Sequence, residues 1–121
     1  MNRRLLLVDD SETVIQFEMR LLHGLGFEMA TAENGKQALQ QVAAQKPDLI
    51  LLDLMMPDMD GFETLRRLRD HPDTKNIPVI VVTTKGAPEA IRQAFEAGCN
   101  DYVTKPFDKV ELVAKIKGVL T

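Results

Sequence analysis

With 121 residues, the chain has room for one domain around one hydrophobic core, so we expect a single domain over residues 1–121. A net charge of −3, without a run of basic residues, argues against direct binding to nucleic acid or to a membrane surface. The apolar runs are too short to cross a bilayer, and no signal-peptide cleavage site follows the first of them. The single cysteine, Cys99, excludes an internal disulfide, and together these features predict a cytoplasmic protein.

Apolar runs of strand length alternate with segments of helical periodicity, which is typical of βαβ units and a parallel sheet. The five predicted strands are residues 4–9, 27–32, 48–53, 78–83 and 101–104. The five predicted helices are residues 12–24, 35–46, 61–70, 88–97 and 108–120. At the start of the third and fifth helices, Asp60 with Glu63 and Asp108 with Glu111 have the spacing of a capping box.

The composition of the strands indicates their order in the sheet. The first, third and fourth strands are apolar throughout, as expected for strands that helices cover on both faces. The second strand mixes polar and apolar residues and the fifth is short, so both suit the edges of the sheet. Right-handed crossovers then allow the order 2-1-3-4-5, a doubly wound α/β sheet whose switch point lies between the first and third strands.

Polar side chains stand where four of the predicted strands end. Asp9 ends the first strand and Asp10 follows it, and Asp53 ends the third. Thr83 ends the fourth strand, and Lys105 follows the fifth. Because the carboxyl ends of parallel strands meet at one edge of a sheet, we expect these five residues to converge in one crevice.

Three carboxylates in one crevice repel each other unless a cation lies between them. A set of oxygen ligands without histidine or cysteine favours Mg²⁺, for which Mn²⁺ could substitute. Lys105 adds a positive charge suited to a phosphoryl group, and Thr83 adds a hydroxyl donor. In this setting, Asp53 is equipped to attack phosphorus and become an acyl phosphate.

Four segments of the sequence, spread over essentially its whole length, carry a family resemblance. They are Val-Asp-Asp-Ser at 8–11, Leu-Asp-Leu-Met-Met-Pro-Asp-Met-Asp-Gly at 52–61, Pro-Val-Ile-Val-Val-Thr at 78–83 and Gly-Cys-Asn-Asp-Tyr-Val-Thr-Lys-Pro-Phe at 98–107. Together and in this order, they resemble the receiver domain of two-component response regulators, including stand-alone receivers of the chemotaxis type. The resemblance implies a flavodoxin-like fold, with five helices around a five-stranded parallel sheet in the order 2-1-3-4-5.

The resemblance also implies which residues bind the metal and the phosphoryl group. Asp53 matches the phosphoacceptor of the family. Asp10, Asp53 and the backbone carbonyl of Met55 match the direct ligands of Mg²⁺, and Asp9 matches a ligand that acts through water. Met55 and Lys85 occupy positions that flank the phosphoryl group in the family, where they govern the access of water.

The remaining implied roles concern charge and switching. Lys105 matches the counter-charge of the phosphoryl group, with a cis peptide bond to Pro106. Thr83 and Tyr102 match the switch pair, in which Thr83 moves to the phosphoryl group and Tyr102 turns inward. The face of the fourth helix, fifth strand and fifth helix would then repack and alter the binding of a partner.

The resulting prediction is a phosphorylation-activated switch rather than a turnover enzyme. A histidine kinase or a phosphotransfer protein would donate the phosphoryl group, which the chain would hydrolyse slowly, and the output would be binding to an unknown protein in chemotaxis or motility. Two alternatives stay open: an intermediate of a phosphorelay, and the receiver domain of a longer regulator with a separate effector domain.

Two other classes of protein fit the sequence less well. An aspartyl-phosphate phosphatase of the haloacid dehalogenase type would have a second aspartate two residues after the nucleophile, where Met55 stands. A flavodoxin-like cofactor binder would have a loop rich in Ser, Thr or Gly after the first strand, where Asp9 and Asp10 would repel phosphate.

The first and fourth predicted helices carry apolar residues beyond those needed for one core stripe. The expected core stripe of the first helix is Val14, Phe17, Leu21 and Leu25. A second stripe on the same helix is Ile15, Met19 and Leu22. This second stripe is either an extension of the buried face or a docking surface for the helix of a phosphodonor. On the fourth helix, we expect Phe95 in the core and Ile91 on the surface, available to a partner.

Overall fold

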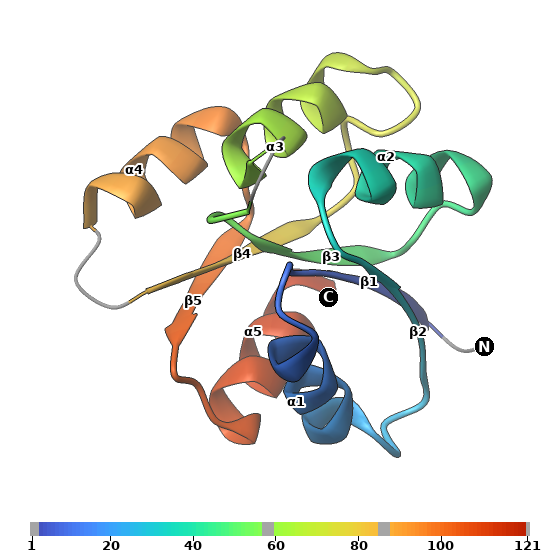
Figure 1. Cartoon of the computed structure of the whole chain (residues 1–121), viewed down its shortest axis with the longest axis vertical. Coiled ribbons are helices and arrows are strands. Elements are labelled where there is room, and N and C mark those ends of the chain that lie inside the picture. The colour runs from blue at the N-terminus through green and yellow to red at the C-terminus, as the bar shows by residue number, and fades with distance from the viewer. Residues whose placement is uncertain (1–2, 57–59, 85–87, 121) are drawn as a thin grey trace.

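The structure, a computed structural model, describes residues 3–56, 60–84 and 88–120 and shows a sheet between two layers of helices. The strands are β1 (Arg3–Val8), β2 (Phe27–Ala32), β3 (Leu49–Asp53), β4 (Val79–Thr84) and β5 (Asp101–Lys105). The helices are α1 (Glu12–Leu22), α2 (Gly35–Ala44), α3 (Gly61–Asp70), α4 (Pro88–Ala97) and α5 (Lys109–Leu120). Helices α2, α3 and α4 cover one face of the sheet, and α1 and α5 cover the other (Figure 1). None of the described helices is long and apolar enough to span a membrane.

All five strands are parallel, in the order β2-β1-β3-β4-β5, which confirms the predicted topology. The two strands predicted for the edges, β2 and β5, lie there. The observed ends of each element lie within two residues of the prediction; α1 and α2 are each two residues shorter at their carboxyl ends.

Side chains of the central strands alternate between two hydrophobic cores. In β1, Leu6 and Val8 face the core beneath α2, α3 and α4, whereas Leu5 and Leu7 face the core beneath α1 and α5. This alternation follows from the two-residue period of a strand. Because both faces of β1, β3 and β4 are covered, an apolar residue is required at nearly every position.

Side-chain caps begin four of the helices where the sequence carries a short polar residue. The N–H of Val14 donates to Ser11 Oγ over 3.3 Å at the start of α1, and the N–H of Gln37 donates to Asn34 at the start of α2. The two predicted capping residues of α3 and α5 accept in the same way, Asp60 from Glu63 N–H and Asp108 from Glu111 N–H. Helix α1 therefore begins directly after Asp9 and Asp10.

The predicted core stripe of α1 is wrong at Phe17 and Leu25, whereas the second stripe extends the buried face, which was one of its two alternatives. The buried residues of α1 are Ile15, Glu18 and Leu22, whereas Phe17 is 38% exposed. Leu25, which follows the helix, is also exposed. Two adjacent apolar stripes leave the rotation of a helix undetermined, and packing against the sheet and α5 decides it. Ile15 belongs to the core beneath α1 and α5, so it is not part of a docking surface.

The predicted orientation of α4 is also wrong. Ala94 is the buried residue of α4, and Phe95, the next residue around the helix, is 45% exposed. Ile91 is half-buried. The small side chain of Ala94 lets α4 approach the sheet, and the ring of Phe95 then packs edge-on against Tyr102 rather than into the core.

Candidate functional site

The predicted crevice forms at the carboxyl edge of the sheet. Carboxylate oxygens of Asp9, Asp10 and Asp53 lie within 4.8 Å of one another, brought together from the ends of β1 and β3. From the end of β5, Lys105 Nζ lies 3.2 Å from Asp9 Oδ2 and 3.7 Å from Asp53 Oδ1. Thr83 is buried near the end of β4, one residue beyond the β4 residue that pairs with Asp53.

Backbone N–H groups hold two of the carboxylates in place. The N–H of Ser11 donates to Asp9 Oδ1 over 2.9 Å, and the N–H of Met55 donates to Asp53 Oδ1 over 3.2 Å. Both Asp9 and Asp53 are buried, whereas Asp10 is exposed. In both residues the backbone N–H bonds to Oδ1, so the Oδ2 atoms of Asp9 and Asp53 do not take part in these two hydrogen bonds.

The charges in the crevice change the acidity of its members. Burial, with a further contribution from Asp9, raises the pKa of Asp53 to about 6, against the opposing effects of the Met55 N–H and Lys105. Burial alone would lower the pKa of Lys105, but the attraction of Asp53 and Asp9 outweighs it and raises that pKa. At neutral pH, Asp53 is mostly ionised and Lys105 is protonated.

The donor chemistry of the crevice fits a hard divalent cation. Three carboxylates approach one another closely, with only Lys105 to compensate their charge among the ion pairs of the described residues. Carboxylate oxygens are the ligands that Mg²⁺ and Mn²⁺ take in proteins. Asp9, Asp10 and Asp53 could therefore hold such an ion; the carbonyl of Met55 as a further ligand stays a prediction.

Tyr102 lies apart from the crevice. Its ring packs against Phe95, with ring centroids 6.2 Å apart, and Lys115 Nζ lies 4.8 Å from the centre of its ring. The peptide bond between Lys105 and Pro106 is cis, as the family resemblance implied. Lys85 lies outside the described residues, so its predicted effect on water access stays a prediction.

One acidic residue close to the crevice, Glu18, was not predicted from the sequence. Glu18 is 1% exposed, and its Oε1 has no hydrogen-bond partner among the described residues. Burial, and then the charge of Asp9, raise the pKa of Glu18 to about 8, although Lys105 opposes this. The sequence did contain a sign of this residue. Glu18 lies three residues after Ile15 and four before Leu22, so it shares their face of the helix, and a charged residue is seldom found on a buried face.

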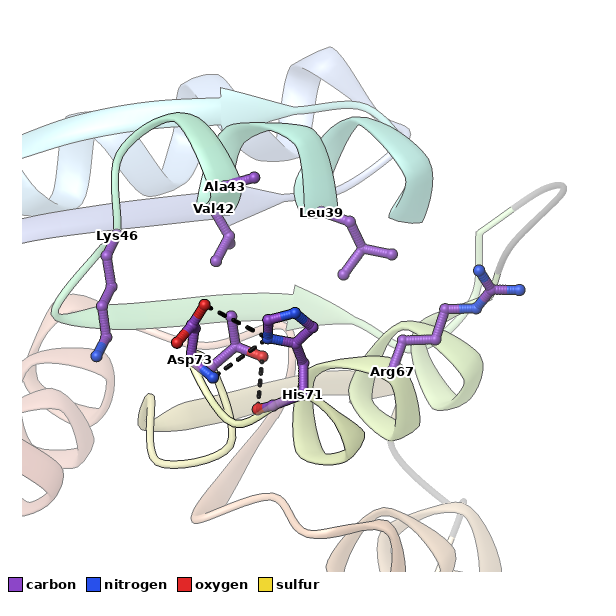
Figure 2. Close-up of a pocket in the computed structure, with 8 residues that line it drawn as sticks. Leu39, Val42, Ala43, Lys46, Arg67, His71 and Asp73 are labelled. Carbon is purple, nitrogen blue, oxygen red and sulfur yellow. Dashed lines mark hydrogen bonds and ion pairs between the residues drawn. The ribbon is translucent and has the colours of Figure 1, made fainter.

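A separate cavity of about 590 Å³ lies between α2 and α3, away from the crevice. Figure 2 shows Leu39 and Val42 of α2 pointing toward His71, with Lys46 and Arg67 on either side. None of the residues predicted to carry the function lines this cavity.

The fold and the crevice together define a class of protein, the flavodoxin-like α/β receivers that carry acids at the switch point of the sheet. Comparison with known families agrees. The family model described as "Response regulator receiver domain" matches residues 5–117. The chain therefore belongs to the family of response regulator receiver domains.

Curated relatives are similar over nearly the whole chain. "Response regulator PleD" of Caulobacter vibrioides is 40% identical over 119 residues, which are 98% of this chain and 26% of PleD. "Phosphate regulon transcriptional regulatory protein PhoB" of Pseudomonas aeruginosa is 42% identical over 118 residues, 98% of this chain and 52% of PhoB. The chain thus spans about a quarter to a half of the length of these relatives.

Solved structures show the same fold. The chemotaxis protein CheY4 of Vibrio cholerae has a TM-score of 0.93 and 31% identity, over 99% of this chain and all of that one. The signal receiver domain of a signal transduction histidine kinase from Syntrophus aciditrophicus has a TM-score of 0.89 and 34% identity, over 98% of this chain and 89% of that one.

Proposed function

We propose that this receiver is a phosphorylation-activated signalling switch that accepts a phosphoryl group on Asp53. The observation that carries the proposal is the position of Lys105 Nζ, within 4 Å of both Asp9 and Asp53 in a crevice of three acids. A carboxylate next to a fixed positive charge and a cluster of metal-ligating oxygens is suited to phosphoryl transfer, in which the protein mainly positions groups and balances charge.

Each crevice residue then has a definite role. An Asp53 oxygen forms the O–P bond while the P–N bond of a donor phosphohistidine breaks, and the electron pair of that bond goes to the imidazole nitrogen. Asp10, Asp53 and the Met55 carbonyl would hold Mg²⁺ directly, and Asp9 would hold it through water. When bound, the ion compensates the charge of the phosphoryl oxygens. Lys105 pairs with the phosphoryl group. Because the phosphoryl group is accepted as a signal, the protein acts as a switch and not as a turnover enzyme.

The signal reaches the surface through Thr83 and Tyr102. The Thr83 hydroxyl moves toward the phosphoryl group, and Tyr102 turns inward from its place against Phe95. This alters the face formed by α4, β5 and α5, to which an output protein binds. We place the protein in the cytoplasm, with a histidine kinase or a phosphotransfer protein as donor.

Three kinds of output are compatible with this switch. The similarity to a chemotaxis protein supports direct binding to a protein of chemotaxis or motility. The match covers only part of PleD and of PhoB, which supports the alternative that this chain is the receiver domain of a longer regulator. The similarity to the receiver of a histidine kinase supports an intermediate in a phosphorelay.

Phosphorylation of the purified chain tests the proposal. With Mg²⁺ and acetyl phosphate, we expect intact mass spectrometry to show the addition of one phosphoryl group to the wild type and to Asp73→Asn. The same treatment should leave Asp53→Asn unmodified. Asp73 is an exposed acid far from the crevice and serves as the matched control. An unmodified wild type, or a phosphorylated Asp53→Asn, would contradict the role of Asp53.

The corrected orientation of α1 moves the proposed docking surface for the phosphodonor. Phe17 is exposed on α1, and its ring lies 5.7 Å from that of Phe107, which follows Lys105 by two residues. We therefore assign the docking surface to Phe17 and its stripe rather than to Ile15. This places an exposed apolar side chain beside the end of β5, where the crevice lysine stands.

Phe17→Ala should slow transfer from the cognate kinase about tenfold, since exposed aromatic anchors carry much of the energy of an interface. Transfer from acetyl phosphate should be unchanged, because this small donor needs no docking surface. Asp73→Asn is the control, because it changes an exposed residue that lies outside α1 and outside the face of α4, β5 and α5. Equal kinase rates for Phe17→Ala and the wild type would remove Phe17 from the docking surface.

A further inference from the structure

The ring of the half-buried Tyr102 is contacted by a side chain of α5. The ammonium group of Lys115 lies 4.8 Å from the centre of the Tyr102 ring, within the range of a cation–π interaction. The same ammonium group lies 3.0 Å from Asp101 Oδ1. Lys115 is thus fixed at one end by a carboxylate and lies over the Tyr102 ring.

Asp101 links the two parts of this arrangement. Its Oδ1 accepts the N–H of Tyr102 over 2.8 Å in addition to the ammonium group of Lys115. The side chains of Asp101 and Lys115 are each 31% exposed, so solvent screens their attraction less than it screens a fully exposed pair. The position of Lys115 is therefore defined relative to the backbone of Tyr102 as well as to its ring.

Phe95 supplies a second contact from α4. The Phe95 and Tyr102 rings meet edge to face, at an interplanar angle of 85°. The half-buried Tyr102 ring thus contacts one side chain of α4 and one of α5, an arrangement that we take as its outward position. An inward turn of Tyr102 must give up the contact with Lys115, although the ion pair between Lys115 and Asp101 can persist.

We propose that Lys115 is a positioning residue that stabilises the outward position of Tyr102. It thereby sets the degree of phosphorylation, or the concentration of a phosphoryl analogue, at which the receiver switches. The inference rests on the switching role proposed for Tyr102. A ligand that binds only the inward state has an apparent affinity that is lowered by the fraction of molecules in that state. Any preference for the outward state therefore weakens its apparent binding. Loss of Lys115 should therefore make switching easier.

Tyr102 is the only tyrosine of the chain, which contains no tryptophan, so its fluorescence and its ring NMR signals report on one residue. Purified chain is titrated with beryllofluoride, an analogue of the phosphoryl group, at saturating Mg²⁺. For Lys115→Met, we expect half-saturation at a concentration about two- to fivefold lower than for the wild type, the worth of one exposed cation–π contact. Without beryllofluoride, its Tyr102 ring signals should already lie part-way toward the saturated position.

Two further variants separate positioning from a merely structural effect. Lys115→Arg keeps a cation over the ring and should restore the wild-type midpoint. Lys117→Met removes an exposed lysine from the same helix, two residues away, and should also keep that midpoint. Fluorine NMR of bound beryllofluoride reports occupancy of the crevice separately from the position of Tyr102.

The outcomes distinguish this inference from the proposed function. If Lys115→Met matches Lys117→Met in midpoint and in the resting Tyr102 signals, Lys115 does not position Tyr102 and the inference fails. It fails equally if Lys115→Met raises the midpoint. If beryllofluoride binds the wild type but leaves Tyr102 unmoved, the proposed switch itself fails, and the inference with it. A lack of binding to the wild type would contradict the phosphoacceptor site.

Discussion

Replacing Gly61 by alanine should lower the free energy of unfolding by about 3 kcal/mol, a large effect for one added methyl group. A Cβ atom at Gly61 would lie 2.4 Å from the carbonyl oxygen of Asp53 and 2.6 Å from Cα of Leu54. Both are backbone atoms, so no side-chain rotation relieves the overlap. Either α3 moves away from the end of β3, or Asp53 is displaced in the crevice. Urea denaturation of the metal-free chain measures the loss of stability.

A matched control is available in the same chain. A Cβ at Gly118, within α5, would meet nothing within 4 Å, so Gly118→Ala should raise the free energy of unfolding by about 0.5–1 kcal/mol. We also expect Gly61→Ala to be phosphorylated by acetyl phosphate more slowly than Gly118→Ala. Wild-type stability and phosphorylation of Gly61→Ala would show that the α3 terminus does not constrain Asp53.

Replacing Glu18 by leucine, in contrast to Gly61→Ala, should stabilise the protein at neutral pH. Burial raises the pKa of Glu18 from 4.5 to about 8, so between these values the folded state binds one more proton than the unfolded chain. Stability then falls as the pH rises through this interval, by about 1.4 kcal/mol per unit. At pH 7, Glu18→Leu should raise the free energy of unfolding by about 3 kcal/mol.

The pH dependence distinguishes this explanation from a simple packing effect. Urea denaturation of metal-free protein at pH 5, 7 and 8 should show the smallest gain from Glu18→Leu at pH 5 and the largest at pH 8. Asp53 also has a raised pKa, but it is present in both proteins, so most of the effect of its own titration cancels from the difference between them. A gain of the same size at all three pH values would show that Glu18 does not titrate between them.

Much of the fold follows from local sequence patterns. Runs such as Leu5–Val8 and Leu49–Leu52 are apolar throughout because strands covered on both faces bury every side chain, so they identify the central strands without a structure. The edge positions of β2 and β5 follow from their polar or short sequences. The crevice was predictable for a related reason: residues that end parallel strands reach the same edge, whatever helices lie between them.

The rotation of helices about their axes was not predictable in the same way. Two apolar stripes on α1 are equally compatible with its periodicity, and the structure buries Ile15 and Leu22 of the second stripe together with Glu18. On α4, the larger Phe95 is exposed and the smaller Ala94 is buried. In both cases, the buried face depends on the shape of the surface under the helix, which residues distant in sequence form.

Local features of the sequence account for the alternation of strands and helices, for the order of the sheet and for the residues of the crevice, because strand periodicity and strand ends can be recognised without the fold. The packing of the folded chain fixes which side chains depart from that pattern. It placed Glu18 in the core near Asp9, and Lys115 over Tyr102. Each contact joins a strand or its carboxyl end to the helix that follows it, but its energy depends on burial and on interatomic distances, which no local pattern of residues records.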